Sequence, residues 1–220
     1  IEVPLPSYTE QKKISYLLIQ VENLINERKK SLLTLDELLQ SVFFDFFGDP
    51  VKNESLHSSR TINSLLSRID SGWSPKCESV SANDEQWGVL KLGAVTSGAY
   101  LQTENKAMLP DVEPKAQHEV RAGDVLFTRK NTHDLVAATA FVYETRPKLL
   151  LPDLIFRLVV KDQNELNPIY LWRLLSYPSF REKIQSLASG AAGSMPNISK
   201  ANLKEVLLPV PGINLQRKFS

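Results

Sequence analysis

The sequence contains a single cysteine, Cys77, in 220 residues. One cysteine excludes an internal disulfide framework, and it fits a reducing compartment such as the cytoplasm. It also excludes a zinc site built from several thiolates. No apolar run approaches the roughly 20 residues that a membrane-spanning helix requires. We therefore expect no membrane partner.

Neither sign of charge is in excess, because 26 lysines and arginines stand against 25 acidic residues. A nucleic-acid-binding surface would therefore need positive charge that is localised on one part of the molecule. Hydrophobic residues make up 42% and charged residues 23% of the chain, which is typical of a folded protein rather than a disordered one. The length suits one globular domain with an extension.

Catalytic signatures are scarce. The three histidines, His57, His118 and His133, have no partners at a metal-binding spacing, and neither standard glycine-rich phosphate loop occurs. The segment Asn167–Tyr170 is similar to the Asn-Pro-Pro-Tyr signature of amino-methyltransferases, but its second proline is missing. No glycine-rich turn for S-adenosylmethionine precedes it, so we interpret it as the entry to a helix. We predict no catalytic residue, no metal and no cofactor on this chain.

A long helix is predicted near the start, within an opening segment that spans residues 1–50. Pro4 and Pro6 favour an extended lead-in, and Ser7–Glu10 matches a capping box. Gly48 and Pro50 are the expected stop signals.

Apolar residues in this helix recur at alternating intervals of four and three, which is typical of a coiled coil. The predicted helix-pairing positions are Ile14, Leu18, Val21, Ile25, Arg28, Leu32, Leu35, Leu39 and Val42. Arg28 fills the one polar position, and we hypothesise that it sets the register of pairing. The helix can act as a rigid spacer with a length of roughly 50 Å. The alternative is a long helix that packs along the core of its own domain.

Residues 51–205 predict a mixed domain, so the fold class is α+β with a long coiled-coil helix followed by a mixed α/β domain. Short runs rich in β-branched and aromatic residues predict strands at 88–93, 124–128, 138–143 and 154–160. Helices are expected at 169–175 and 178–187.

The two ends of the chain repeat each other. Residues 208–220 match residues 3–15 at one constant spacing, with identical residues at paired positions: Pro4 and Pro209, Pro6 and Pro211, Gln11 and Gln216, Lys13 and Lys218, Ser15 and Ser220. We interpret residues 206–220 as the start of a second helical repeat, and the chain as one unit of a longer protein with alternating helical and globular segments.

Three polar segments are candidates for DNA contacts, because arginine and asparagine read base edges while lysine and threonine suit phosphates. They are a turn at 71–76, a loop directly after the predicted strand 124–128, and a stretch at 183–204 that contains no acidic residue. The candidate DNA-binding residues are Lys76, Thr128, Arg129, Lys130, Asn131, Thr132, His133, Ser194, Asn197, Lys200 and Lys204. The alternative is that these loops are simply polar surface.

Several short sequence motifs resemble motifs in the specificity subunits of type I restriction-modification systems. Those similar to the helical spacer of that family are Pro4–Gln11, Leu35–Phe43 and Phe47–Pro50. Those similar to its target-recognition domains are Val120–Phe127, Gly193–Ser199 and Leu208–Pro211.

The resemblance implies a non-catalytic subunit in which each of two target-recognition domains reads one half of a split DNA sequence. Two antiparallel helices fix the gap between the halves and dock methyltransferase subunits, which use S-adenosylmethionine, and motor-nuclease subunits are a further partner. For this chain we expect double-stranded DNA, methyltransferase subunits and a second spacer helix as partners. That helix comes either from the same parent chain or from a second copy. The alternative function is a coiled-coil scaffold that does not read DNA.

Overall fold

The computed structural model describes residues 5–53, 55, 57–190 and 195–220. The chain forms two compact units, Ile1–Asp45 and Phe46–Ser220. The first holds most of helix α1 (Tyr8–Phe47), whose last residues, Phe46 and Phe47, belong to the second.

Helix α1 has 40 residues and rises about 60 Å. The predicted capping box is present, since the Ser7 amide donates to Glu10 Oε2 at 2.8 Å and the Glu10 amide donates to Ser7 Oγ at 3.4 Å. Gly48 ends the helix with a φ of 72°, a conformation that favours glycine. The predicted pairing positions from Ile14 to Leu39 have exposed side chains, with exposed fractions of 37–63% for the apolar ones. Their pairing stays a prediction.

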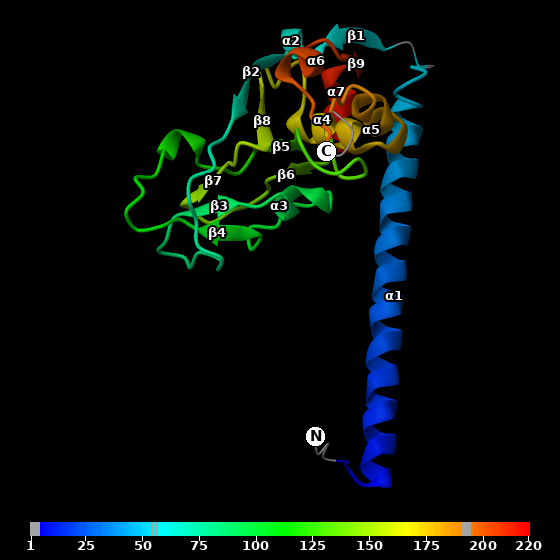
Figure 1. Cartoon of the computed structure of the whole chain (residues 1–220). Helices are drawn as coiled ribbons and strands as arrows, with labels where there is room; N and C mark the ends of the chain where they lie inside the picture. The colour runs from blue at the N-terminus through cyan, green and yellow to red at the C-terminus, as the bar shows by residue number, and fades with distance from the viewer. Residues whose placement is uncertain (1–4, 54, 56, 191–194) are drawn as a thin grey trace. The chain divides into compact units, whose positions relative to one another are not determined.

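The described residues of the second unit form three sheets, whose strands are labelled in Figure 1. A two-stranded antiparallel sheet joins β1 (Ser58–Thr61) to β9 (Leu207–Val210). A four-stranded antiparallel sheet has the order β2 (Leu66–Ser71), β8 (Ile155–Val160), β5 (Val125–Thr128), β6 (Thr139–Phe141). A three-stranded sheet has the order β4 (Asn105–Ala107), β3 (Gly88–Leu90), β7 (Leu149–Leu150), with β3 and β7 parallel.

Strand β8 is one of the two central strands of the four-stranded sheet, and its first four residues are buried. The run of β-branched and aromatic side chains in β8 suits a strand with neighbours on both edges. Arg157 is the exception in this run. It is 8% exposed, and its guanidinium donates to Asp70 Oδ2 at 3.0 Å and to Asp124 Oδ2 at 3.3 Å.

One apolar core joins the two larger sheets. It takes side chains from β3, β5, β6, β7 and β8, and from the short helix α3 (Gly93–Thr96). Its buried members are Leu90, Ala94, Val95, Val120, Leu126, Ala140, Val142, Leu149, Leu151 and Ile155.

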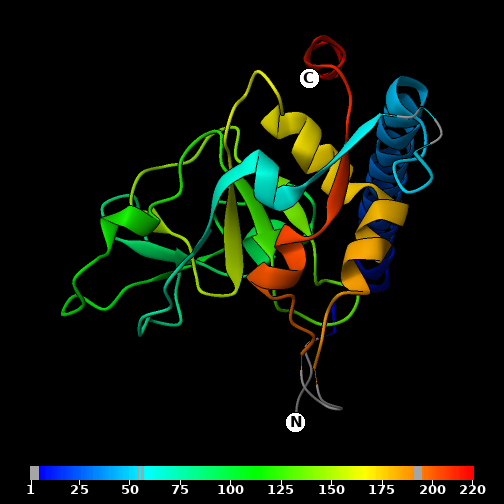
Figure 2. The same ribbon diagram turned by 90° about the horizontal axis from the view of Figure 1, so that it is seen from above.

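Helices gather at the end of this unit away from β3, β4 and β7 (Figure 1). They are α2 (Ile62–Leu65), α4 (Pro168–Ser176), α5 (Pro178–Gln185), α6 (Lys200–Lys204) and α7 (Ile213–Phe219). A separate 3₁₀ turn covers Ala116–His118. Figure 2 shows the C-terminal segment crossing the domain beside β1. Residues 207–219 thus supply β9 and α7 to this unit, while their continuation as a second spacer stays a prediction.

The predicted α+β class with a long N-terminal helix is confirmed. The four predicted strands and both predicted helices are present within a few residues of their expected bounds. The segment Asn167–Tyr170 is a helix entry as interpreted, because Asn167 Oδ1 accepts the Ile169 and Tyr170 amides at 2.8 and 3.4 Å.

Candidate nucleic-acid interface

Two of the three candidate DNA-contact segments lie side by side. Lys130 and Asn197 form an isolated antiparallel bridge. The Asn131 amide donates to the Pro196 carbonyl oxygen at 3.3 Å, and the Ile198 amide donates to that of Arg129 at 2.8 Å. These backbone bonds hold the loop after β5 against the segment that precedes α6, although more than 60 residues separate them in the sequence.

The third segment, the turn at 71–76, is held near the other two by contacts with the turn before β8. The Trp73 amide donates to the Leu151 carbonyl oxygen at 2.9 Å, and Ser74 Oγ hydrogen bonds with the Asp153 carboxylate. Gly72 permits this contact, because a Cβ at Gly72 would lie 1.9 Å from the Leu151 carbonyl oxygen. Lys76 follows two residues after Ser74 and is exposed.

Arg129 connects all three segments. Its Nε donates to the Asp153 carbonyl oxygen at 2.8 Å, and its Nη1 donates to Asn197 Oδ1 at 3.0 Å. Its guanidinium lies 5.5 Å from the centre of the Phe156 ring, and Lys200 Nζ lies at the same distance from that ring. A cation at the face of an aromatic ring is favourable, and the two hydrogen bonds fix the direction of the guanidinium.

Helix α6 adds a further pair of cations. Ser199 Oγ accepts the Asn202 amide at 3.0 Å and so fixes the helix start. Lys200 and Lys204 stand four residues apart, which places them on the same side of the helix. We call the surface formed by Lys76, Arg129, Lys130, Asn197, Lys200 and Lys204 the basic face.

Thr128 and Asn131, both predicted to contact DNA, are instead buried, with exposed fractions of 0 and 6%. The Thr128 hydroxyl donates to the Leu135 carbonyl oxygen at 2.9 Å and accepts the Ala138 amide at 2.9 Å. Asn131 Oδ1 accepts the Thr132 amide at 2.8 Å. These two residues shape the loop from inside, because β5 is a central strand that is buried over its whole length.

Three other predicted residues lie at the tip of the loop or outside the described part of the chain. Thr132 and His133 lie at the exposed tip of the loop, where His133 Nδ1 is 3.7 Å from Asp134 Oδ1. Ser194 lies outside the residues that the structure describes.

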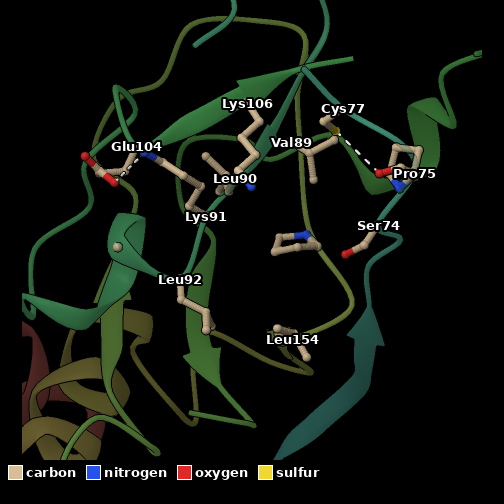
Figure 3. Close-up of a pocket in the computed structure, with 12 residues that line it drawn as sticks. Ser74, Pro75, Cys77, Val89, Leu90, Lys91, Leu92, Glu104, Lys106 and Leu154 are labelled. Carbon is tan, nitrogen blue, oxygen red and sulfur yellow. Dashed lines mark hydrogen bonds and ion pairs between the residues drawn. The ribbon is translucent and has the colours of Figure 1, made fainter. Parts of the chain in front are cut away.

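A pocket of about 560 Å³ opens between the turn at Ser74–Cys77 and strand β3 (Figure 3). Val89, Leu90 and Leu154 supply apolar lining, while Lys106 and a Lys91–Glu104 ion pair of 2.9 Å supply charge. Ser74 and Leu154 belong both to this pocket and to the turns that support the basic face. The pocket therefore shares two residues with the turns that support the basic face, and its polar lining carries both signs of charge.

Other chemistry in the molecule is limited. Across residues 5–53, 55, 57–190 and 195–220, no group of three or more histidine, cysteine and carboxylate side chains could hold a metal ion. Burial raises the pKa of the Cys77 thiol, which keeps it neutral and weakly nucleophilic. Within the same residues, no helix is long and apolar enough to cross a membrane.

Residue patterns did not identify the supports of the basic face. Ser74, Asp153 and Phe156 hold Arg129 and the turn in place through contacts between distant segments. The one available signal was a Pro152-Asp153 turn directly before the predicted strand at 154–160.

Two curated proteins of the same kind are similar to this chain. The chain is 34% identical over 159 residues to the EcoEI type I restriction enzyme specificity subunit of Escherichia coli, covering 71% of this chain and 26% of that protein. It is 28% identical over 109 residues to the putative MjaX type I specificity subunit of Methanocaldococcus jannaschii, covering 49% and 25%. The chain thus spans about a quarter of the length of these relatives. No family model matches it.

Solved structures show the same fold. The HsdS subunit from Thermoanaerobacter tengcongensis superposes with a TM-score of 0.51 at 20% identity, over 99% of this chain and 50% of that one. A chain from a study of complex assembly and conformational transition in the type I R-M system superposes with a TM-score of 0.55 at 18% identity, over 98% and 51%. The resemblance to type I specificity subunits is confirmed by the relative that is 34% identical, and the solved structures agree with it in fold.

Proposed function

We propose that this chain is a non-catalytic DNA-recognition module of a type I specificity subunit. The globular unit Phe46–Ser220 binds one half of a split double-stranded target, and helix α1 sets the spacing to the other half. The observation that carries this proposal is the 34% identity to the EcoEI specificity subunit over 71% of the chain.

The basic face supports the same function. Overall charge is nearly balanced, at +1, yet Lys130, Lys200 and the Asn197 amide lie around Arg129. The turn that carries Lys76 is held at the same place through Asp153. Lysines that project from loops and from a short helix suit phosphate contacts, which supply most of the affinity of a protein for DNA.

Arg129 is the side chain best prepared for reading a base. Its Nε and Nη1 are committed to Asp153 and Asn197, while its Nη2 has no hydrogen-bond partner among the described residues. A guanidinium held in a fixed direction can donate to the O6 or N7 atom of guanine without first losing conformational freedom. Loops on a rigid sheet are the usual place for such contacts.

Partners and cofactors follow from the proposed role. Helix α1 would dock methyltransferase subunits, and its apolar seam would pair with a second spacer helix. S-adenosylmethionine would bind the methyltransferase partner rather than this chain, and a motor-nuclease subunit would join the same complex. We expect the assembly to act in the cytoplasm, where it meets cellular DNA.

Salt dependence of DNA binding tests the proposal on the full chain with random-sequence duplex DNA. Fluorescence anisotropy at several salt concentrations gives the slope of log affinity against log salt. Replacing Lys76, Lys130, Lys200 and Lys204 by glutamine should make this slope shallower by roughly 3–4, because each phosphate that a lysine neutralises adds about 0.9 to it.

Lys161→Gln is the matched control. Lys161 is exposed and directly follows the last residue of β8, whereas Arg129 bonds beside the first residue of that strand. The control should keep the wild-type slope. A slope near zero for the wild-type chain, or equal changes in the control and the fourfold variant, would contradict the proposed face and favour a scaffold that does not bind DNA.

A further inference from the structure

Asn197 is held in place by main-chain bonds on both sides. Its amide donates to the Ser189 carbonyl oxygen at 2.9 Å, and its carbonyl oxygen accepts the Ser189 amide at 3.0 Å. On the other side it forms the antiparallel bridge with Lys130, next to the bond from the Ile198 amide to the Arg129 carbonyl oxygen. Ile198 is fully buried. These contacts fix the backbone at residue 197 without using the Asn197 side chain.

The Asn197 side chain is oriented by Arg129. Arg129 Nη1 donates to Asn197 Oδ1 at 3.0 Å. A guanidinium only donates hydrogen bonds, so the amide atom that faces it must be the oxygen and the other must be Nδ2. The guanidinium is itself fixed, because its Nε donates to the Asp153 carbonyl oxygen and its Cζ lies 5.5 Å from the centre of the Phe156 ring. The amide therefore has one defined orientation.

Two hydrogen-bond donors stand next to this bond. Among the described residues, neither Asn197 Nδ2 nor Arg129 Nη2 has a hydrogen-bond partner. Neither atom belongs to the buried polar atoms that lack a partner, so both are open to solvent. Each belongs to the same planar group as one end of the Nη1···Oδ1 bond. The pair thus presents two donors, while the Asn197 oxygen is already bound to Arg129.

A pair of donors distinguishes guanine from the other bases of a duplex. In the major groove guanine presents two acceptors, O6 and N7, whereas adenine presents one acceptor and one amino donor. Cytosine presents an amino donor, and thymine presents one acceptor beside a methyl group. An asparagine that reads adenine accepts from the N6 amino group with its oxygen. Here that amino group would lie beside the Arg129 guanidinium, which also donates, so guanine is the base that matches both donors.

We propose that Asn197 contacts a base together with Arg129. Asn197 Nδ2 and Arg129 Nη2 donate to the O6 and N7 atoms of one guanine in the DNA half-site that this chain binds. The inference rests on the proposed DNA recognition, and it adds the identity of one base and a second residue that reads it. Lys130 and Lys200, on the same face, contact phosphates, which carry no direct sequence information.

A fixed pair of donors suits a base better than a phosphate. Flexible lysines serve phosphates as point charges, and Lys200 Nζ stands beside the same Phe156 ring as Arg129. Reading a base edge requires donors with defined directions, and ordering a long side chain at the moment of binding costs conformational entropy. The bonds of Arg129 and Asn197 supply this order in the folded chain before DNA binds.

Asn197→Asp in the full chain tests the inference. The new carboxylate still accepts from Arg129, but it replaces the Nδ2 donor by an acceptor oxygen. Competition fluorescence anisotropy measures binding of the chain, together with the cognate methyltransferase, to duplexes that carry the methylated split motif. Each guanine of the half-site is replaced in turn by adenine, which exchanges the O6 acceptor for an amino donor, or by 7-deazaguanine, which removes the N7 acceptor.

The expected result is confined to one guanine. There the wild-type chain should prefer guanine over both replacements by roughly 5-fold or more, the size expected for a good pair of contacts to a base edge. Asn197→Asp should abolish the preference over adenine if Nδ2 faces O6, or the preference over 7-deazaguanine if it faces N7. Asn197→Ala removes the same donor without adding charge, and it should weaken the same preference.

Asn202→Asp is the matched control. Asn202 is exposed in helix α6 between Lys200 and Lys204. Its substitution adds the same charge to the same surface and leaves the bond between Arg129 and Asn197 intact, so the preference for guanine should remain. Because main-chain bonds hold residue 197, the Asn197 variants should melt at the temperature of the wild type.

The remaining outcomes separate this inference from the proposed function. If Asn197→Asp keeps both preferences at every guanine, Asn197 only holds Arg129 in place and the inference is overturned. Equal weakening of all duplexes assigns the Asn197 donor to a phosphate and also overturns it, as does a half-site that contains no guanine. DNA recognition by the chain stands in these three cases. If no methylated motif depends on this gene, the proposed function fails and the inference fails with it.

Discussion

Gly72 allows the turn before Lys76 to run against the backbone of the segment before β8. A Cβ at this position would lie 1.9 Å from the Leu151 carbonyl oxygen and 2.4 Å from that of Pro152. Gly72→Ala should therefore force the two segments apart and lower the free energy of unfolding by roughly 1–3 kcal/mol or more. Urea denaturation measures this change.

Gly212→Ala is the control for that substitution, because a Cβ at Gly212 would meet nothing within 4 Å. It removes a helix N-cap glycine, which should cost less than about 1 kcal/mol. Equal losses for the two variants would show that close backbone approach at Gly72 is not what stabilises the turn.

Glu10 gives the start of helix α1 a pH dependence. Hydrogen bonds from the Ser7 hydroxyl and amide lower the pKa of the Glu10 carboxyl below its ordinary value. Because the folded-state pKa is lowered, the stabilisation of the first turn is complete above the ordinary value. It is lost as the pH falls through the lowered pKa. NMR titration of the Ser7 amide should follow this loss, and Ser7→Ala should return the Glu10 pKa toward its ordinary value.

At the scale of elements, strand β8 depends on the partners of its one buried cation. Arg157 also donates to the carbonyl oxygens of Glu119 at 2.8 Å and Gln117 at 3.1 Å. Burial raises the pKa of the Asp124 carboxyl, an effect that Arg157 opposes. Arg157→Met should cost roughly 3–5 kcal/mol in unfolding experiments, because two carboxylates lose their buried cation.

The control for β8 is Arg68→Met. Arg68 also pairs with Asp70, at 3.0 Å, but its side chain is 62% exposed. Removing an exposed ion pair should change the stability by less than about 1 kcal/mol. Comparable effects of the Arg157 and Arg68 substitutions would contradict the importance of burial in this network.

Arg28 interrupts the apolar seam of helix α1 and is exposed. A charged residue at a seam position specifies register at a cost in stability. Arg28→Leu should therefore keep the helix associated but change its register or stoichiometry, which analytical ultracentrifugation and DNA half-site spacing can detect. Unchanged stoichiometry together with unchanged spacing would remove the proposed role of Arg28.

For the molecule as a whole, the sequence predicted those elements that are specified by residues close together in the chain. Helix α1 has a capping box, a periodic seam and a glycine stop, and β5 and β8 are mainly apolar runs. Strand β2 was not predicted, because four of its six residues are polar and its pairing partner β8 lies far along the chain. Strands β1 and β9 were missed for a similar reason, since each is stabilised mainly by the other.

The sequence predicted only part of the candidate site, for the same physical reason. Residue chemistry identified the three cationic segments, but their meeting at Arg129 depends on bonds to Asp153 and Asn197 from distant loops. The burial of Thr128 depends on the central position of β5. Polarity alone therefore assigned Thr128 to the surface.

The most direct test of the proposed DNA recognition is a map of N6-methyladenine in cells that carry the cognate methyltransferase, with and without this gene. We predict that deletion removes methylation from one split motif and that the fourfold lysine variant weakens it. A palindromic motif would indicate pairing with a second copy, and an asymmetric motif would indicate a two-domain parent. An unchanged set of methylated motifs after deletion would contradict the role in DNA recognition.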